Sequence, residues 1–237
     1  MTWRSLICFS LACGASWGAV VTGEVEITNS RDAAVRKHRD YTGVVLWLEP
    51  ADNSAVPTPP APQRVQMIQR EKRFTPHVIV VPLGTAVDFP NFDPIFHNAF
   101  SNFSGMPFDV GLYPPGKSRI VVFKQPGIVR VFCNIHPTMS AIIAVMATPW
   151  YVLTPASGKY IIEGVPAGEY QLRLFYERAV PENLKALERR ITVPENGLTL
   201  PLISISETGF LPAQHLNKYG KEYPPVIEGE TYPGAPK

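Results

Sequence analysis

The sequence has little charge and no excess of one sign. Charged residues make up 18% of the 237 residues, and 22 basic residues against 20 acidic ones leave a formal net charge of +2. No block of Lys or Arg stands out, which argues against a nucleic-acid partner held by bulk electrostatic attraction. Beyond the first residues, no apolar run approaches the roughly 20 residues that a membrane-spanning helix requires. We therefore expect neither a nucleic-acid partner nor a transmembrane segment in the mature chain.

The first residues have the pattern of an export signal. Arg4 supplies a positive charge, an apolar stretch follows, and small residues precede a plausible cleavage point after Gly18. We expect residues 1–18 to be a signal peptide and the mature protein to be periplasmic or otherwise exported. Acylation of Cys13 is the alternative, and Ser10 disfavours it because a lipobox usually has Leu at that position.

Cysteine is scarce as well, with 3 residues in the whole chain. Cys8 and Cys13 lie within the expected signal peptide, so the mature protein keeps Cys133 alone. A single thiol in an oxidising compartment cannot form an internal disulfide, and it calls for burial, catalysis or metal binding.

Cys133 begins a C-x2-H-x2-M pattern that continues with His136 and ends at Met139. His97 lies upstream, where a predicted strand gives way to a loop. A thiolate and two imidazoles in a trigonal plane suit copper in both oxidation states, and a thioether can be a weak axial ligand. We therefore expect His97, Cys133, His136 and Met139 to bind one copper ion that changes between Cu(I) and Cu(II).

Each ligand candidate also has an ordinary structural explanation. A lone cysteine is often a buried thiol, and a histidine on an apolar strand is commonly a packed core residue. The combination of four such residues in one pattern favours a metal site. Zinc would accept cysteine and histidine, but methionine is a poor zinc ligand. Of the remaining histidines, we expect His77 to be structural and His38 and His215 to be solvated.

Histidine is too scarce for further copper clusters. The chain has 5 His residues, and two of them belong to the predicted site. Oxidases and nitrite reductases need additional His-rich copper centres, which the remaining residues cannot build. We therefore expect that the protein is not an enzyme.

Short runs of β-branched and aromatic residues, separated by turns, predict an all-β protein. Hydrophobic residues make up 45% of the chain, which also has 25 Pro and 17 Gly. The expected strands of the first domain cover residues 21–28, 43–48, 65–74, 77–81, 86–89, 117–123, 127–132 and 140–147. The predicted metal loop lies between the last two of them. After residue 148 the pattern changes to hairpins with Pro/Gly turns.

These patterns divide the chain into four segments. We expect a signal peptide at 1–18, a copper-binding domain at 19–147, a smaller β-sandwich at 148–206 and an extended tail at 207–237. The tail is assigned from its high content of Pro, Gly and charge without periodicity.

Residues 133–139 and the pair His97 and Asn98 resemble the ligand loops of the cupredoxins, and Pro137 makes the loop similar to that of amicyanin. Residues 91–98 also resemble a group of bacterial plastocyanin-like proteins, some of them called methylamine utilization proteins. In that group a carboxypeptidase regulatory-like sandwich follows, which residues 157–160 and 164–170 resemble. The resemblance implies a cupredoxin Greek-key β-sandwich followed by a smaller β-sandwich domain.

The resemblance implies a blue-copper protein that carries single electrons between redox partners. It also implies that Asn98 reaches toward Asn134 and ties the ligand loops together. We expect His136 to be the more exposed imidazole and the point of electron exit, beside Pro137. The alternative is a structural or sensory copper-binding module of an envelope complex, in which the C-terminal sandwich recognises the partner.

Overall fold

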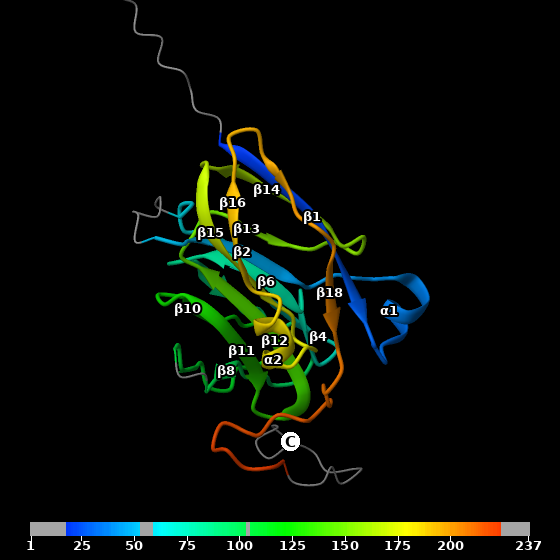
Figure 1. Cartoon of the computed structure of the whole chain (residues 1–237). Helices are drawn as coiled ribbons and strands as arrows, with labels where there is room; N and C mark the ends of the chain where they lie inside the picture. Colours follow the sequence, from blue (N-terminus) through cyan, green and yellow to red (C-terminus); the bar gives the residue numbers. More distant parts are fainter. Residues whose placement is uncertain (1–17, 53–58, 103–104, 224–237) are drawn as a thin grey trace, which may run out of the picture.

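The computed structural model describes residues 18–52, 59–102 and 105–223. These residues form sheets that stack in layers (Figure 1), with two short helices, α1 (Ala33–His38) and α2 (Pro181–Lys185), among the described segments. The predicted all-β class is confirmed, and the arrangement is consistent with a cupredoxin β-sandwich. The predicted signal peptide, apart from Gly18, and the tail beyond Tyr223 lie outside the described residues.

No helix in the described segments is long and apolar enough to cross a bilayer.

One sandwich is built from both ends of the described chain, and we call it the terminal sandwich (residues 19–50 and 151–206). Its strands are β1 (Ala19–Thr28), β2 (Val45–Pro50), β13 (Tyr151–Leu153), β14 (Lys159–Val165), β15 (Gly168–Phe175), β16 (Arg189–Val193), β17 (Leu198–Thr199) and β18 (Ile203–Ser206). In one sheet β1 pairs antiparallel with β14 and parallel with β17 and β18. The facing sheet has the order β13-β2-β15-β16.

Alternation of side chains explains this packing. In β15 the buried residues Tyr170, Leu172 and Leu174 alternate with partly exposed ones, as expected when one face of a strand covers a core. Trp150 closes the core edge, with its ring 5.3 Å from that of Tyr170 in an edge-to-face arrangement.

The first two strands therefore belong to the same hydrophobic core as residues 150–205. The sequence pattern places them with the metal-loop segment instead. Pairing between distant strands depends on complementary faces and leaves little local signal in the sequence. The division of the chain into domains at residue 147 stays a prediction.

The second sandwich lies between β2 and β13 in the chain, and we call it the inserted sandwich (residues 59–147). Its strands are β3 (Arg64–Gln66), β4 (Ile68–Arg70), β5 (Arg73–Thr75), β6 (Val78–Pro82), β7 (Ala86–Asp88), β8 (Phe100–Ser101), β9 (Phe108–Asp109), β10 (Ile120–Val122), β11 (Gly127–Cys133) and β12 (His136–Met146). A five-stranded sheet, β6-β12-β11-β8-β9, faces a three-stranded sheet, β10-β7-β3. Large buried side chains such as Phe89, Tyr113 and Phe123 fill the space between them.

Strand β12 joins the two sandwiches because both of its faces are covered. Ile143 and Val145 belong to the core of the inserted sandwich, whereas Ala144 and Met146 pack with Val45 of the terminal sandwich. Residues 141–146 are all buried. A strand that is covered on both sides has a continuous apolar run rather than an alternating one.

Gly158 occupies a position where a side chain cannot fit. Its φ is +73°, and an added Cβ would lie 2.2 Å from the backbone oxygen of Val25 in β1. We expect Gly158→Ala to lower the free energy of unfolding by about 3 kcal/mol, since left-handed strain and overlap with backbone add together. Gly164 is a matched control, because its φ is +68° but nothing lies within 4 Å of the added Cβ. Urea unfolding of both variants should show a loss of only about 1 kcal/mol for Gly164→Ala. Equal losses would contradict the overlap argument.

His77 connects the two sandwiches. Its Nε2 lies 2.5 Å from Glu177 Oε2 after β15, and its Nδ1 lies 3.1 Å from the backbone oxygen of Ser140 in β12. Only an imidazolium can donate from both nitrogens. The hydrogen bond to Glu177 raises the pKa of His77, although burial and the charge of Arg178 oppose the rise.

This pair makes stability depend on pH. Because the folded pKa of His77 is raised, its contribution is fully present below about pH 6.5 and is lost as the pH rises through the folded pKa. We expect the loss of unfolding free energy caused by His77→Ala to be large at pH 5.5 and to shrink as the pH rises toward 9. Urea unfolding across this range tests it, with His38→Ala on the exposed end of α1 as the control. A pH-independent loss would show that His77 acts through packing alone.

Candidate metal centre

A tight connection between β11 and β12 supplies two of the predicted ligands. Cys133 ends β11 and His136 begins β12, and these two residues pair with each other. The preceding pair is Phe132 with Ser140, so residues 137–139 have no partner on β11 and bulge from the ladder. This bulge brings Met139 back toward the strand end where Cys133 lies.

His97 reaches the same place from another part of the chain. It forms an isolated bridge with Tyr113, in which the His97 N–H donates to the Tyr113 oxygen at 3.1 Å and the Tyr113 N–H donates back at 2.9 Å. Tyr113 is fully buried, and its hydroxyl donates to the Phe89 oxygen at 2.8 Å. The backbone that carries His97 is therefore fixed on both sides.

The three predicted ligands that bind through nitrogen or thiolate sulfur lie together. Cys133 Sγ is 3.7 Å from His97 Nδ1 and 3.5 Å from His136 Nδ1, and the three donor atoms lie within 4.8 Å of one another. Metal–sulfur and metal–nitrogen bonds of about 2.3 and 2.0 Å, at trigonal or tetrahedral angles, separate such atoms by about 3.5–3.8 Å. The spacing therefore fits a single metal ion.

Asp93 fixes the orientation of His97. The His97 Nε2–H donates to Asp93 Oδ2 at 2.7 Å, which leaves the Nδ1 lone pair directed toward Cys133. The carboxylate also accepts the backbone N–H groups of Glu71 at 2.5 Å and Lys72 at 2.8 Å. Burial works to raise the pKa of Asp93, but these hydrogen bonds outweigh it and hold that pKa below its usual range.

The sequence patterns do not predict this role of Asp93. The four-residue spacing from Asp93 to His97 is visible in the sequence, but the hairpin turn that donates two backbone N–H groups to the carboxylate is not. In that turn Glu71 and Lys72 have φ values of +54° and +56°. These positive values are uncommon for residues other than glycine. They direct both backbone N–H groups at one carboxylate, which compensates the strain.

The protonation states suit metal binding. Burial lowers the pKa of both imidazoles, and the pKa of His136 falls to about 4 with further contributions from the neighbouring His97 and Lys72. Both rings are therefore neutral near pH 7 and have lone pairs to donate. Burial raises the pKa of the Cys133 thiol, against hydrogen bonds from the backbone N–H groups of Ile135, Asn98 and His136. A metal cation would supply the charge that favours the thiolate.

Met139 is 1% exposed and belongs to the same buried cluster as Cys133. Burial beside Cys133 supports Met139 as the fourth ligand but does not establish it, so this role stays a prediction.

Asn98 differs from the expectation. Its Nδ2 donates to Asp109 Oδ1 at 2.7 Å rather than reaching Asn134. The Asn134 Oδ1 instead accepts the backbone N–H of Lys218 at 2.9 Å. The backbone N–H of Asn98 donates a hydrogen bond to the Cys133 sulfur. Asn98 therefore still connects the segment that carries His97 with the metal loop, but through its main chain.

The segment that follows the terminal sandwich crosses the metal loop, and we call residues 211–223 the covering segment. Figure 1 shows it, in orange to red, running across the end of the inserted sandwich where β11 ends. His215, which we expected to be solvated, stacks on Phe132 at 4.4 Å, and its Nε2–H donates to the His136 oxygen at 3.1 Å. Nothing in its composition predicted this contact.

Two further residues of the covering segment hold it in place, one on the loop and one on β9. The Tyr223 hydroxyl donates to the Cys133 oxygen at 2.9 Å, and Lys218 Nζ lies 2.7 Å from Asp109 Oδ2. Both imidazoles of the site are buried, with His97 0% and His136 6% exposed. His136 is the more exposed of the two imidazoles, as expected, but the covering segment and the loop leave little of its surface exposed.

Comparisons with known proteins add only weak likenesses. No protein-family profile matches the sequence, and no curated protein matches it. A solved purple cupredoxin from Nitrosopumilus maritimus is similar over 35% of this chain and 99% of its own, at 23% identity and a TM-score of 0.32. A reduced amicyanin mutant is similar over 35% of this chain and 82% of its own, at 15% identity and a TM-score of 0.34.

A copper-containing nitrite reductase from Thermus scotoductus is similar over 41% of this chain at 31% identity, with a TM-score of 0.33. This chain covers 25% of that enzyme. Because all these TM-scores are low, the assignment of the site depends on the geometry of its own residues.

Proposed function

We propose that this protein binds one type 1 copper ion through His97, Cys133, His136 and Met139 and carries single electrons between exported redox partners. The observation that carries the proposal is the group of three buried donor atoms, within 4.8 Å of one another, from two separate parts of the chain. When bound, copper supplies one-electron oxidation and reduction at this ligand set.

The residues around the ligands keep them in place and keep water out. Asp93 orients His97, and three backbone N–H groups point at the Cys133 sulfur. The two imidazoles are at most 6% exposed, which leaves little room for a substrate. A site that is rigid and closed favours electron transfer over catalysis, because electrons can cross a few ångströms of protein and substrates cannot.

A structural or sensory copper module remains the second candidate. The contacts of His215 and Tyr223 with the loop favour it, since they bury the site further. For this candidate we propose that the terminal sandwich recognises the partner. Its likeness to carboxypeptidase regulatory-like modules is also a proposal. The rate of electron self-exchange between Cu(I) and Cu(II) protein separates the two candidates, because a carrier must exchange quickly.

Titration of the mature protein with Cu(II) tests the proposed site. We expect an intense visible thiolate-to-copper band that saturates at one equivalent and disappears on reduction with ascorbate. Titration with Zn(II) is the control and should give no visible band. A colourless one-to-one copper complex would refute the type 1 assignment.

Met139→Leu should keep the copper and the visible band but raise the reduction potential. Loss of the weak thioether donor disfavours Cu(II) more than Cu(I), whereas leucine preserves the volume in the buried cluster. Met67→Leu is the matched control, because Met67 is also fully buried in the same cluster. Voltammetry of both variants measures the effect. An unchanged potential in Met139→Leu would exclude Met139 as a ligand.

A further inference from the structure

The metal loop has two sides, and one of them is occupied by the chain itself. The covering segment donates hydrogen bonds to the backbone oxygens of Cys133 and His136. The other side opens into a cleft of about 670 Å³ between the β4–β5 hairpin and the start of β12. Its walls are residues 71–75, His77 and residues 138–140. A partner that must come close to the ligands without displacing the chain has this cleft available.

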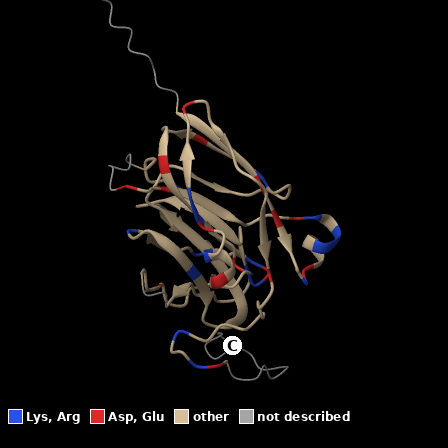
Figure 2. Ribbon diagram, in the orientation of Figure 1, with Lys and Arg blue, Asp and Glu red and all other residues tan. Residues whose placement is uncertain are grey.

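The hairpin gives the cleft a positive charge. Arg70, Lys72 and Arg73 are exposed, and in the described part of the chain none of them has an ion-pair partner. Glu71 is the one acidic residue of this turn, so the three basic residues and one acidic residue leave a net charge of +2. Figure 2 shows another group of basic residues on α1, in the terminal sandwich, so the basic turn is distinguished by its place at the cleft beside the metal loop.

The basic turn is also fixed relative to the metal ligands. The backbone N–H groups of Glu71 and Lys72 donate to Asp93, and Asp93 accepts from His97. The opposite wall of the cleft carries Met139. Two hydrogen bonds therefore separate the turn from one ligand, and the lining of the cleft includes Met139, another ligand candidate.

An apolar ring lies beside these charges. The Arg70 guanidinium lies 5.1 Å from the centroid of the Phe92 ring, which is itself 54% exposed. An exposed aromatic ring next to unpaired basic groups provides both contact area and electrostatic attraction.

We propose that the redox partner presents an acidic surface and docks on this basic cleft, which Lys72, Arg73 and Thr138 line. Arg70, with the Phe92 ring, extends the basic surface beside the cleft. The inference rests on the proposed function and adds the docking face and the charge of the partner. It differs from docking over His136, because the covering segment occupies that face. Unpaired positive charge at the cleft speeds the encounter with an acidic partner and makes it sensitive to salt.

Small charged oxidants test the docking face on the copper-loaded protein. The Cu(I) form is oxidised by anionic hexacyanoferrate(III) or by cationic tris(phenanthroline)cobalt(III), which each accept one electron. At low salt, Lys72→Glu with Arg73→Glu should slow the anionic oxidant about tenfold and accelerate the cationic one, with both effects fading at high salt.

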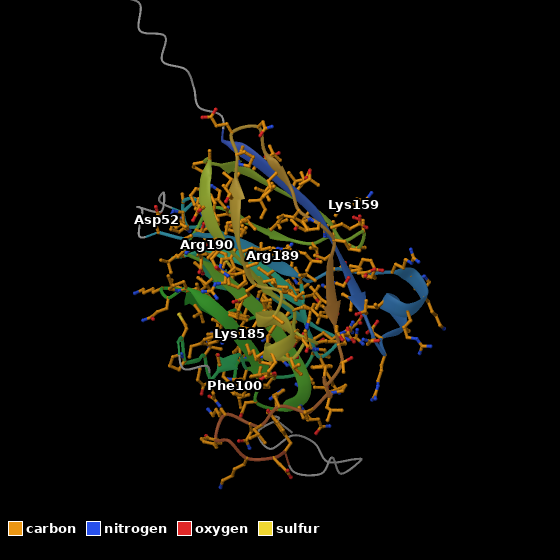
Figure 3. The ribbon with its side chains drawn as sticks, in the orientation of Figure 1. Asp52, Phe100, Lys159, Lys185, Arg189 and Arg190 are labelled. Carbon is orange, nitrogen blue, oxygen red and sulfur yellow. The ribbon has the colours of Figure 1, made fainter. Side chains whose placement is uncertain are left out.

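A matched control carries the same change of charge elsewhere. Lys37→Glu with Lys159→Glu reverses two exposed lysines on the terminal sandwich, and Figure 3 shows Lys159 at the opposite side of the molecule from Phe100. We expect this control to change both rates less than twofold. Equal effects of the two double variants would overturn the docking inference, since net charge alone would then explain them.

Modification of Cys133 in the metal-free protein provides a readout that does not need copper. The thiolate attacks a methanethiosulfonate, forming a mixed disulfide and releasing methanesulfinate, and peptide mass spectrometry follows Cys133 alone. With one anionic and one cationic reagent, the ratio of rates reports the charge along the approach. Lys72→Glu with Arg73→Glu should lower the ratio of anionic to cationic rates about tenfold.

Variants of the covering segment define the opposite outcome. Tyr223→Phe removes the hydrogen bond to the Cys133 oxygen, and Tyr219→Phe removes the hydroxyl of an exposed neighbour as control. If Tyr223→Phe accelerates both reagents while the charge variants leave their ratio unchanged, the approach lies under the covering segment and the docking inference is wrong. A protein without the visible copper band would contradict the proposed function, whereas the thiol rates would still decide the docking face.

Discussion

Replacing Cys133 by serine should abolish the visible band and weaken copper binding by at least 100-fold. A serine hydroxyl is too hard and too weakly acidic to replace the thiolate, so the two imidazoles would be left without the anionic ligand between them. The apo protein should stay folded, because serine is slightly smaller and its oxygen can accept from the same backbone N–H groups. Absorption spectra and a competitive chelator titration measure the change.

Thr138→Ser is the control for this variant. Thr138 is an exposed residue of the same loop, and its substitution should leave both the band and the affinity unchanged. A visible band in Cys133→Ser would show that another residue supplies the charge-transfer ligand, and the proposed ligand set would then be wrong.

Asp93→Asn should lower copper affinity about 10- to 100-fold and raise the reduction potential. A neutral amide oxygen is a weaker hydrogen-bond acceptor than a carboxylate for the His97 Nε2–H. The imidazole then becomes a weaker electron-pair donor to the metal, which disfavours Cu(II). The amide nitrogen of asparagine cannot accept a hydrogen bond, so one of the two backbone N–H groups that now bond separate Asp93 oxygens loses its acceptor, and the β4–β5 turn should lose protection. Voltammetry measures the potential, and amide hydrogen exchange of the turn in the apo protein measures the second effect.

Asp88→Asn provides the comparison. Asp88 is buried in β7 of the same sandwich and pairs with Arg64 and Ser118 rather than with a ligand. Its replacement should reduce stability without changing the potential. If both variants shift the potential equally, the effect of Asp93 comes from general loss of charge and not from orientation of His97.

Three of the ligand candidates could be predicted because they lie a few residues apart in the sequence, at a spacing typical of a metal-binding loop. Cys133 and His136 are adjacent in the strand connection, and a pattern of three residues is enough to reveal them. The all-β class was predictable for a related reason, since strand alternation and turn residues are local signals.

The remaining features depend on contacts between distant residues. The pairing of β1 with β18, the turn around Asp93 and the stacking of His215 on Phe132 each join segments that no periodicity connects. Asn98 shows the limit most clearly. An amide can satisfy several partners, and here Asp109 provides a charged acceptor while Lys218 occupies Asn134.

Strand β12 has a consequence for how the protein unfolds. Ile143 faces one core and Ala144 faces the other, so the two sandwiches share a strand that neither can release alone. Both connections of the inserted sandwich return to the terminal sandwich, at β2 and β13, which join in one sheet. Melting of either core would expose the apolar face of β12 and dissolve the pairing that sets Cys133 beside His136. The chain therefore behaves as a single cooperative unit, in which the integrity of the metal site reports on strands more than a hundred residues away in sequence.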